Sequence, residues 1–447
     1  MLTPVKTFRD AVHIDVPVTQ VELDIIDTQP LQRLKRVLQV PGVSLLFPSA
    51  THTRFAHSLG TMHVAGLYST RLFPGDFSRQ QIVRLAALLH DVAHGPFGHQ
   101  YDDTVYRRLY RNTPHGHDHH RERIVKRTEI RDRLGSYSAD EIIKAWDSAS
   151  IEDCIIHGVL GADKMDYLLR DSYFAGVPQF GRVAKERLIN LCSRTRHAGR
   201  EVLCYPQKAF DDIVVASLAR FLMYRNVYFH KTPRAADILL RQILEESINH
   251  LRLVERTRDL DEFQRLDDYS LIGELRALSK GGGRVTRLSR LANRLFRRQL
   301  YKMVHQHVIE SMRDLIEAHP GTREEELIKR LAEDCIAGIR KEIRTKSRIE
   351  LYWDTPYRLS VCNPEEFTEQ GIFIRDPKSR PPIITLKDMF LRTKWARGLA
   401  IAHPYEDQSF RVFRVYTTAE SRRVVDTAVS RWKRRNSTRE AESAISF

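Results

Sequence analysis

The sequence predicts a mainly α-helical protein, with an all-helical body followed by a smaller α+β lobe. Two observations predict this fold class. Apolar residues recur at helical spacing through residues 1–310, whereas from Arg348 short apolar runs alternate with turn residues, as they do in strands. The chain has 447 residues, of which 42% are hydrophobic and 29% are charged, so it can bury a sizeable core. We therefore expect a body at 1–310 and a lobe at 311–447, with a polar tail from about residue 433.

Helices are expected in the body where the apolar spacing persists, at 19–40 with a break marked by Pro30, and at 57–72, 80–90, 151–170, 210–228, 235–253 and, rich in arginine, 287–298. The helix at 80–90 must stop near His94, because Gly95 and Pro96 follow and a residue before proline avoids the α region. Strands are expected in the lobe at 349–352, 372–374, 383–385 and 410–416, with a closing helix at 421–432.

Composition narrows the class of protein and its partners. The net charge is +15, from 72 Lys and Arg against 57 Asp and Glu, which favours a nucleotide or, through a basic surface, nucleic acid as partner. The arginine-rich helix at 287–298 is more simply interpreted as a solvated surface helix. Five cysteines without a C-x-x-C pair exclude a zinc ribbon and a disulfide scaffold and fit a reducing cytosol. No apolar run approaches the ~18 residues of a membrane span and no secretory signal is recognisable, so we expect a cytoplasmic protein without membrane contact.

The histidines carry the sharpest chemical signal. His90 and Asp91 are adjacent at the end of an apolar helix, where an ionised carboxylate is costly to bury unless it is paired or bound to a metal. A divalent ion takes imidazole nitrogens and carboxylate oxygens together, so two further ligands must come from elsewhere. His57 and Asp163 are the candidates, and they complete the order H…HD…D. Each residue alone is more simply a helix cap or a hydrogen-bonded core residue, but the four together favour a metal site.

The sequence around these residues resembles the HD superfamily of metal-dependent phosphohydrolases, and within it the branch of the deoxynucleoside triphosphate (dNTP) triphosphohydrolases. The segments that carry the resemblance follow the family's order: Ile26–Thr28, Leu31–Leu34, Arg54–Gly60, His90–Phe97, Asp163–Tyr167, Arg170–Asp171 and Tyr228–Lys231. The order H…HD…D alone identifies the superfamily, whereas the flanking segments identify the branch. The resemblance implies an HD domain whose motif-bearing core covers about 50–175.

The resemblance also implies a cofactor and a reaction. The cofactor would be a divalent Mn, Mg or Fe ion, held by His57, His90, Asp91 and Asp163. Such an ion polarises a phosphoryl oxygen and lowers the pKa of bound water. Water would attack the α-phosphorus of a dNTP and release the deoxynucleoside and tripolyphosphate. Two alternatives stay open: an HD-type nuclease or phosphohydrolase of another nucleotide or single-stranded nucleic acid, and a nucleic-acid binder with a degraded HD site, which ranks lowest because all four ligands are present.

Acid–base candidates lie beside the ligands. His94 follows the His-Asp pair by one helical turn and would reach the same phosphate. Asp102 would orient a histidine from the tract Pro114–His120, and that pair would supply a proton to the 5′-oxygen leaving group. His117 best matches the family's histidine, with the later histidines of the tract as alternatives. The simpler interpretation of the tract is an adventitious metal-binding loop.

The resemblance assigns a substrate pocket as well. Its members are Arg54 and Lys164 for the phosphates, Gln39 and Asp171 for the 3′-hydroxyl, Tyr167 for the deoxyribose, and Arg220, Tyr224 and Tyr228 for the base and phosphate end. The tyrosine ring under the sugar would leave no room for a 2′-hydroxyl, although an apolar wall rejects an added hydroxyl only modestly. Taken singly, each tyrosine is more simply a packed core residue.

In the family, nucleotides bound between subunits assemble the oligomer. The positions that match those contacts are Lys6, Asp27, His230 and Lys231. The resemblance therefore implies a nucleotide effector and a homo-oligomer, either a dimer or a tetramer. Arg9 and Asn226 differ from the family's pattern, so the resemblance does not identify the effector.

Overall fold

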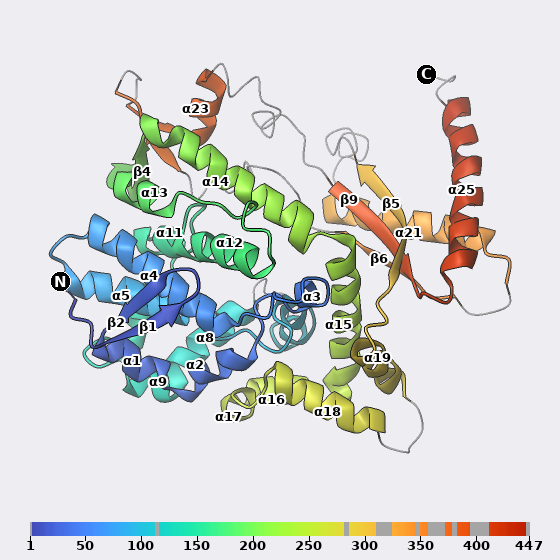
Figure 1. Cartoon of the computed structure of the whole chain (residues 1–447), viewed down its shortest axis with the longest axis horizontal. Helices are drawn as coiled ribbons and strands as arrows, with labels where there is room; N and C mark the ends of the chain where they lie inside the picture. The colour runs from blue at the N-terminus through green and yellow to red at the C-terminus, as the bar shows by residue number, and fades with distance from the viewer. Residues whose placement is uncertain are drawn as a thin grey trace.

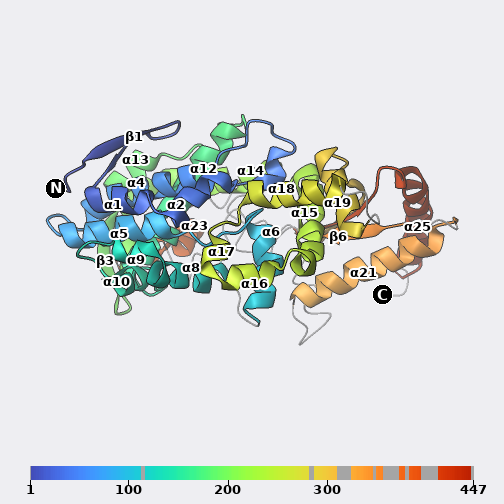
Figure 2. The ribbon, with the colours of Figure 1, turned by 90° about the horizontal axis from the view of Figure 1, so that it is seen from below.

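The computed structural model describes residues 2–111, 116–280, 286–309, 324–345, 349–355, 372–377, 382–393 and 411–443. A broad helical body contains the N-terminal end, and a smaller group of strands and helices lies at the other end (Figure 1). Seen from below, the molecule is elongated, with α21 (Glu324–Glu342) and α25 (Arg422–Ser443) opposite the end that holds β1 (Lys6–Asp10) (Figure 2). The predicted fold class, mainly helical with strands in the C-terminal region, is confirmed.

The first half of the body consists of short and medium helices. They are α1 (Gln20–Ile26), α2 (Gln29–Arg33), η1 (Leu34–Arg36), α3 (Pro41–Ser44), α4 (Arg54–Leu72), α5 (Phe77–Leu89), α6 (His99–Tyr101), η2 (Asp102–Tyr106), α7 (Arg107–Leu109), α8 (Gly116–Arg127), α9 (Glu129–Asp132), α10 (Ala139–Lys144), α11 (Ile151–His157), α12 (Ala162–Phe174) and α13 (Lys185–Leu191). The break predicted at Pro30 within 19–40 is confirmed, whereas the single helix predicted at 151–170 is wrong, since it is divided into α11 and α12. Pro30 opens α2, because proline is tolerated only in the first turn of a helix. Gly161 precedes α12, where a Cβ would lie 2.5 Å from the backbone oxygen of Ile156.

The second half of the body continues with longer helices. They are η3 (Gln207–Ala209), α14 (Phe210–Met223), η4 (Tyr224–Tyr228), α15 (Lys231–His250), α16 (Leu253–Arg258), α17 (Leu260–Phe263), α18 (Asp268–Lys280) and α19 (Arg287–Phe296). The helix predicted at 210–228 has the expected extent, but its last turn, η4, is π-helical. α15 begins four residues before its predicted start, because the side chain of His230 caps it by accepting the backbone N–H of Thr232 at 3.3 Å.

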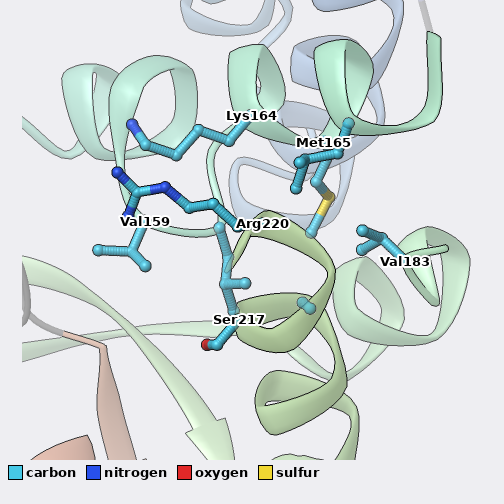
Figure 3. Close-up of a pocket in the computed structure, with 9 residues that line it drawn as sticks. Val159, Lys164, Met165, Val183, Ser217 and Arg220 are labelled. Carbon is cyan, nitrogen blue, oxygen red and sulfur yellow. The ribbon is translucent and has the colours of Figure 1, made fainter. Parts of the chain in front are cut away.

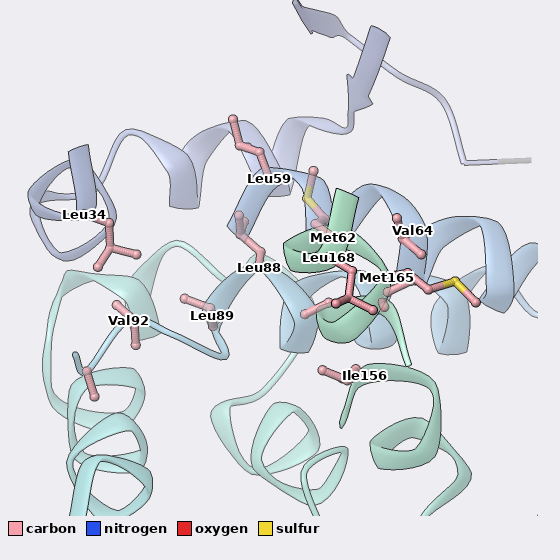
Figure 4. Close-up of a cluster of buried hydrophobic side chains, with 14 of the residues drawn as sticks. Leu34, Leu59, Met62, Val64, Leu88, Leu89, Val92, Ile156, Met165 and Leu168 are labelled. Carbon is pink, nitrogen blue, oxygen red and sulfur yellow. The ribbon is translucent and has the colours of Figure 1, made fainter. Parts of the chain in front are cut away.

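Helix α4 is the centre of the apolar core. It packs against α5 and α12, and 14 of its 19 residues are buried. Leucine, methionine and valine side chains of the three helices meet there (Figure 4). Thr53 starts α4 by accepting the backbone N–H of Ala56 through its hydroxyl oxygen. Because the predicted metal ligands lie on or directly after these helices, the core positions the candidate site.

The strands form three small sheets. The first is the antiparallel hairpin of β1 and β2 (Ile14–Val18). The second has the order β3-β4-β7-β8, from β3 (Ser193–His197), β4 (Arg200–Pro206), β7 (Phe373–Arg375) and β8 (Ile383–Thr385), and the third has the order β5-β9-β6, from β5 (Lys302–Ile309), β6 (Leu351–Asp354) and β9 (Arg411–Thr417). Hairpins β1–β2 and β3–β4 correct the prediction of a body without strands. The sequence Ser193–His197 is polar throughout, so it lacks the alternation by which a half-buried strand is recognised.

The C-terminal strands belong to two different sheets. Strand β7 pairs in parallel with β4, so it extends a sheet that begins in the body. Strands β6 and β9 instead pair with β5, which lies at the end of the predicted body. A second apolar core, which includes Ile339, Val415 and Val429, joins this sheet to α21 and α25. The helix α23 (Leu386–Arg392) follows β8.

The closing helix is longer than predicted. α25 continues to Ser443, whereas the sequence predicted an end at Trp432 and a polar tail from about 433. The added residues include Arg, Ala and Glu, which have high helix propensity. In the part of the chain that the structure describes, no helix combines the length and the apolar character that a membrane span requires.

Candidate active site

The four predicted metal ligands converge from three helices. His57 lies in the first turn of α4, His90 and Asp91 directly follow α5, and Asp163 lies in the first turn of α12. His57 Nε2 is 3.2 Å from His90 Nε2 and 3.1 Å from Asp163 Oδ1. The carboxylate oxygens of Asp91 approach His90 Nε2 to 3.5 Å and His57 Nε2 to 3.8 Å. The ligand atoms of His57, His90 and Asp163 all lie within 4.8 Å of one another, which is the spacing of groups that share one ion.

Hydrogen bonds on the far side of both imidazoles favour a cation between them. His57 Nδ1 lies 2.7 Å from Asp166 Oδ2, and His90 Nδ1 lies 2.7 Å from the backbone oxygen of Ala87. Both partners accept, so each Nδ1 carries a proton. The two Nε2 atoms face each other at 3.2 Å, a contact that needs a positive charge, which a proton on His57 or a bound cation supplies. With two carboxylates beside two imidazoles, the donor set fits a divalent metal ion.

The charges of the site favour a cation as well. Burial would lower the pKa of His57, but its two aspartate partners outweigh burial and raise this pKa to about 10. Burial lowers the pKa of His90 to about 4, so this ligand stays neutral. Burial would raise the pKa of Asp91, but Arg54, 2.6 Å away, holds it well below its usual value. The site therefore presents ionised carboxylates and a neutral imidazole to an incoming cation.

The predicted acid–base residues form a second cluster beside the first. His94 Nε2 lies 3.2 Å from Asp91 Oδ1, and His94 Nδ1 lies 3.4 Å from Asp102 Oδ2. His117 Nδ1 lies 3.4 Å from the other oxygen of Asp102, and the two imidazoles stack with centroids 4.6 Å apart. Burial would lower the pKa of His117, but Asp102 outweighs burial and raises this pKa. The raised pKa favours the protonated form of His117, which a proton donor requires, although the three side chains also have the spacing of metal ligands.

The other histidines of the tract face elsewhere. His120 is buried in an aromatic cluster with Phe263, and His119 is exposed. His115 lies outside the described residues. Of the tract's described histidines, only His117 contacts Asp102, which is the register that the resemblance favoured.

Two protein-family models match the chain, and one of them spans the site. Residues 54–171 match the HD domain, and residues 215–343 match the HD associated region. The chain carries an HD domain. The match runs from α4 to α12, so it includes the four predicted ligands and the three predicted acid–base residues. The chain therefore carries an HD domain followed by an HD associated region.

Relatives of this HD-domain chain include proteins of named and unnamed activity. An uncharacterized protein of Methanocaldococcus jannaschii is 32% identical over 298 residues, which are 66% of this chain and 59% of that protein. A deoxynucleoside triphosphate triphosphohydrolase SAMHD1 homolog of Dictyostelium discoideum is 27% identical over 336 residues, which are 68% of this chain and 61% of that protein. The chain thus spans less than two thirds of either relative. A phosphohydrolase of Bacteroides thetaiotaomicron shares the fold with a TM-score of 0.67 at 22% identity, over 92% of this chain and 99% of that one.

The residues predicted to bind the deoxyribose gather on one side of the HD domain. Asp171 accepts the hydroxyl of Tyr228 at 2.5 Å and lies 2.7 Å from His52 Nε2. The rings of Tyr167 and Tyr228 meet edge to face with centroids 6.4 Å apart. Gln39 donates its backbone N–H to the backbone oxygen of His52 at 3.1 Å, and its side-chain Oε1 is buried without a hydrogen-bond partner. A buried acceptor without a donor is costly, so this oxygen is open to a donor from a ligand.

The residues predicted to bind the phosphates lie on α4, α12 and α14. Lys164 and Arg220 line a narrow pocket between α12 and α14 with apolar residues that include Val159, Met165 and Val183. Their side chains extend to the same side in this view (Figure 3). Arg220 also lies over the ring of Tyr224, 5.5 Å from its centroid. Arg54 pairs with Asp91 through Nη1, while its buried Nε and Nη2 have no hydrogen-bond partner. These nitrogens are available to an anion.

The predicted effector residues are spread over one chain. Lys6 is exposed on β1, Asp27 directly follows α1, and His230 and Lys231 stand at the start of α15. Among the described residues, none of the four forms an ion pair with another. A site shared between subunits needs a second chain, so the effector and the oligomer stay predictions.

Sequence reasoning missed three polar residues of the site. Asp166 holds the ligand His57, His52 contacts Asp171, and exposed His99 lies 3.2 Å from Asp102 Oδ2. Asp166 had a local signal, since it lies four residues before Arg170 on the same helix face, where opposite charges pair. The contact of His52 joins positions 119 residues apart, so no local pattern indicates it.

Proposed function

We propose that this HD-domain protein is a phosphohydrolase that converts dNTPs to deoxynucleosides and tripolyphosphate. One observation carries the proposal: buried polar atoms without hydrogen-bond partners belong both to a residue predicted to bind the phosphates and to a residue predicted to bind the sugar. Arg54 Nε and Nη2 are donors without acceptors, and Gln39 Oε1 is an acceptor without a donor. A triphosphate supplies acceptors and a 3′-hydroxyl supplies a donor, so a dNTP would satisfy both groups. The named triphosphohydrolase among the relatives supports the same substrate class.

The metal would be held by His57, His90, Asp91 and Asp163. When bound, it would supply Lewis acidity, which polarises a phosphoryl oxygen and lowers the pKa of a coordinated water. Arg54 would neutralise the phosphate charge next to the ligands, with Lys164 and Arg220 toward the far end of the triphosphate. These cations would also hold the α-phosphorus in one place, which is most of what phosphoryl transfer asks of a protein.

The leaving group and the sugar would be handled by this chain's own side chains. His117, oriented by Asp102, would donate its proton to the 5′-oxygen as the bond to the α-phosphorus breaks. Tyr167 would pack against the deoxyribose and leave no room for a 2′-hydroxyl. Asp171 and Gln39 would hydrogen-bond the 3′-hydroxyl.

The test incubates the protein with Mn²⁺ or Mg²⁺ and each dNTP, singly and mixed, and separates products by anion-exchange chromatography. The proposal expects deoxynucleoside and tripolyphosphate, with turnover lowered about 10²–10⁴-fold in Asp102→Asn. Asp103→Asn is the matched control, since Asp103 is the exposed neighbour that pairs with Arg241. Deoxynucleoside monophosphate and pyrophosphate would overturn the proposed reaction. Faster turnover of mixed than of single dNTPs would reveal an effector. A measured metal content of one ion per chain would leave the cluster of His94, Asp102 and His117 without a metal and assign it to acid–base catalysis.

A second candidate substrate is single-stranded nucleic acid, and one surface feature favours it. A hollow of about 550 Å³ between α7 and α16 is lined by four exposed arginines, none of which forms an ion pair within the described residues: Arg108, Arg111, Arg252 and Arg258. The predicted basic helix α19 is less available, because Arg287 pairs with Glu246 and Arg294 with Glu420. Cleavage of single-stranded DNA or RNA without dNTP turnover would favour this candidate.

A further inference from the structure

Asp166 is the buried carboxylate behind the ligand His57, and all of its acceptor positions are occupied. Its Oδ2 accepts from His57 Nδ1 at 2.7 Å and from Arg170 Nε at 2.9 Å. Its Oδ1 accepts from Arg170 Nη2 at 2.8 Å and from His13 at 2.6 Å. A carboxylate offers about four acceptor sites, so these four donors fix its orientation. Three of the donors come from the HD domain, and His13 comes from the N-terminal hairpin.

Lys185 fixes which nitrogen of His13 carries the proton. Lys185 Nζ lies 3.0 Å from His13 Nδ1, and an ammonium group can only donate. The Nδ1 atom must therefore accept, which leaves the proton of a neutral ring on Nε2, the atom that faces Asp166. Both side chains are buried, so water does not compete for these bonds.

The turn of the hairpin is shaped to place His13 inward. Asp10 Oδ1 accepts two backbone N–H groups of the turn at 2.9 Å each, and its Oδ2 accepts from Arg170 Nη1 at 2.7 Å. The next residue after His13 is Ile14, whose φ of 67° is left-handed and is rarely adopted by a β-branched residue. The hairpin lies beside α4 (Figures 1 and 2). Arg170, which also donates to Asp166, therefore holds this strained turn in place through its hydrogen bond to Asp10.

Gly60 leaves the space that this network occupies. A Cβ at Gly60 would lie 1.8 Å from Asp166 Oδ1 and 2.4 Å from Arg170 Nη2. Helix α4, which also carries His57, therefore lacks a side chain where the carboxylate and the guanidinium pass. The absence of a side chain at Gly60 on α4 thus makes room for the ion pair of Asp166 and Arg170 on α12.

We propose that His13, oriented by Lys185, is a positioning residue of the metal centre, and that the N-terminal hairpin at 6–18 is part of that centre. The hairpin lies outside the HD match at 54–171, yet it supplies the fourth donor to the carboxylate that orients His57. Without that donor, Asp166 can rotate and His57 loses its fixed ring position. Outer-shell hydrogen bonds of this kind set ligand orientation and affinity. The inference rests on the metal site of the proposed function and is independent of the substrate.

Mn²⁺ binding to the whole chain, followed by electron paramagnetic resonance, tests the inference. His13→Ala is expected to weaken Mn²⁺ binding about 10-fold, the lower end for outer-shell partners, because His13 acts through Asp166. His13→Gln places an amide donor near the position of Nε2 and is expected to restore most of the affinity. Lys185→Met is expected to weaken binding, since the His13 proton can then move to Nδ1. Arg9→Ala is the matched control, because it removes an exposed hairpin ion pair with Asp15 and should bind Mn²⁺ normally.

Bound Co²⁺ supplies a spectroscopic readout that a merely structural role would not move. Its visible absorption bands are expected to shift in His13→Ala and to stay unchanged in Arg9→Ala. Wild-type affinity in His13→Ala, a His13→Gln variant as weak as His13→Ala, or an equal loss in Arg9→Ala would each overturn the inference. Thermal unfolding of the metal-free variants checks the fold, and if His13→Ala does not fold, His13→Gln and Lys185→Met decide the matter.

Parallel dNTP assays separate this inference from the proposed function. Mn²⁺ binding that depends on His13, in a protein that does not hydrolyse dNTPs, would support the inference and contradict the proposed function. Hydrolysis of dNTPs by a protein whose Mn²⁺ affinity is unchanged in His13→Ala would support the proposed function and contradict the inference. A wild-type chain that binds no divalent ion would overturn both.

Discussion

Replacing Arg170 by methionine tests whether the ionic network behind the metal ligands stabilises the HD domain. The Arg170 guanidinium donates to Asp166 at 2.9 and 2.8 Å and to Asp10 at 2.7 and 3.2 Å. Arg170→Met leaves both carboxylates buried without their cation. The loss is that of breaking a buried ion pair from one side, ~3–5 kcal/mol in the free energy of unfolding. Arg187→Met is the matched control, because its 2.7 Å ion pair with Asp212 lies at the surface, where such pairs contribute ~0–1 kcal/mol.

Thermal unfolding of both variants without metal measures this difference. Unfolding entropy is about 2.1 cal/mol/K per residue, so 447 residues give roughly 0.9 kcal/mol/K. Arg170→Met should therefore lower the Tm by about 3–5 °C, and Arg187→Met by about 1 °C or less. Equal shifts in the two variants would refute the argument, since burial would then make no difference to the strength of the ion pair.

Three further results are expected. Removal of divalent ions with EDTA should abolish hydrolysis and added Mn²⁺ should restore it, so activity that survives EDTA would contradict a metal mechanism. Tyr167→Ala should lower the ratio of kcat/KM for dATP over ATP by up to about 100-fold, and an unchanged ratio would exclude Tyr167 as the ribose wall. Burial lowers the pKa of His120 to about 3, below the value of ~6.5 in an unfolded chain, so stability is full above about pH 6.5 and is lost as the pH falls toward 3. Urea unfolding at about pH 7 and pH 5 should show a smaller loss in His120→Gln than in the wild type, and an equal loss would assign the acid sensitivity to other groups.

The sequence could indicate the buried His/Asp cluster because metal-site chemistry leaves a pattern along the chain. His57, His90, Asp91 and Asp163 keep a fixed order with distinctive flanks, and the helices that carry them have strong apolar spacing. The same spacing misled at 151–170, where apolar residues continue across Gly158 and Gly161 although the backbone turns there.

Long-range polar contacts could not be predicted in this way. His13 and Asp166 are in contact although 153 positions separate them in the chain. The sequence around His13 gives no sign that this histidine has a buried partner. The sheet pairing of β4 with β7 likewise joins residues near 204 and 373, which no local pattern indicates. Local patterns reveal helices and short motifs, whereas pairing between distant segments depends on the whole fold.

The most direct test of the proposed reaction follows the oxygen of water. Hydrolysis of a dNTP in ¹⁸O-labelled water with Mn²⁺, followed by mass spectrometry of both products, shows which bond breaks. Attack at the α-phosphorus predicts one ¹⁸O atom in tripolyphosphate and none in the deoxynucleoside, with both products lost in Asp91→Asn. Label in the deoxynucleoside, or release of monophosphate and pyrophosphate, would contradict the proposed reaction.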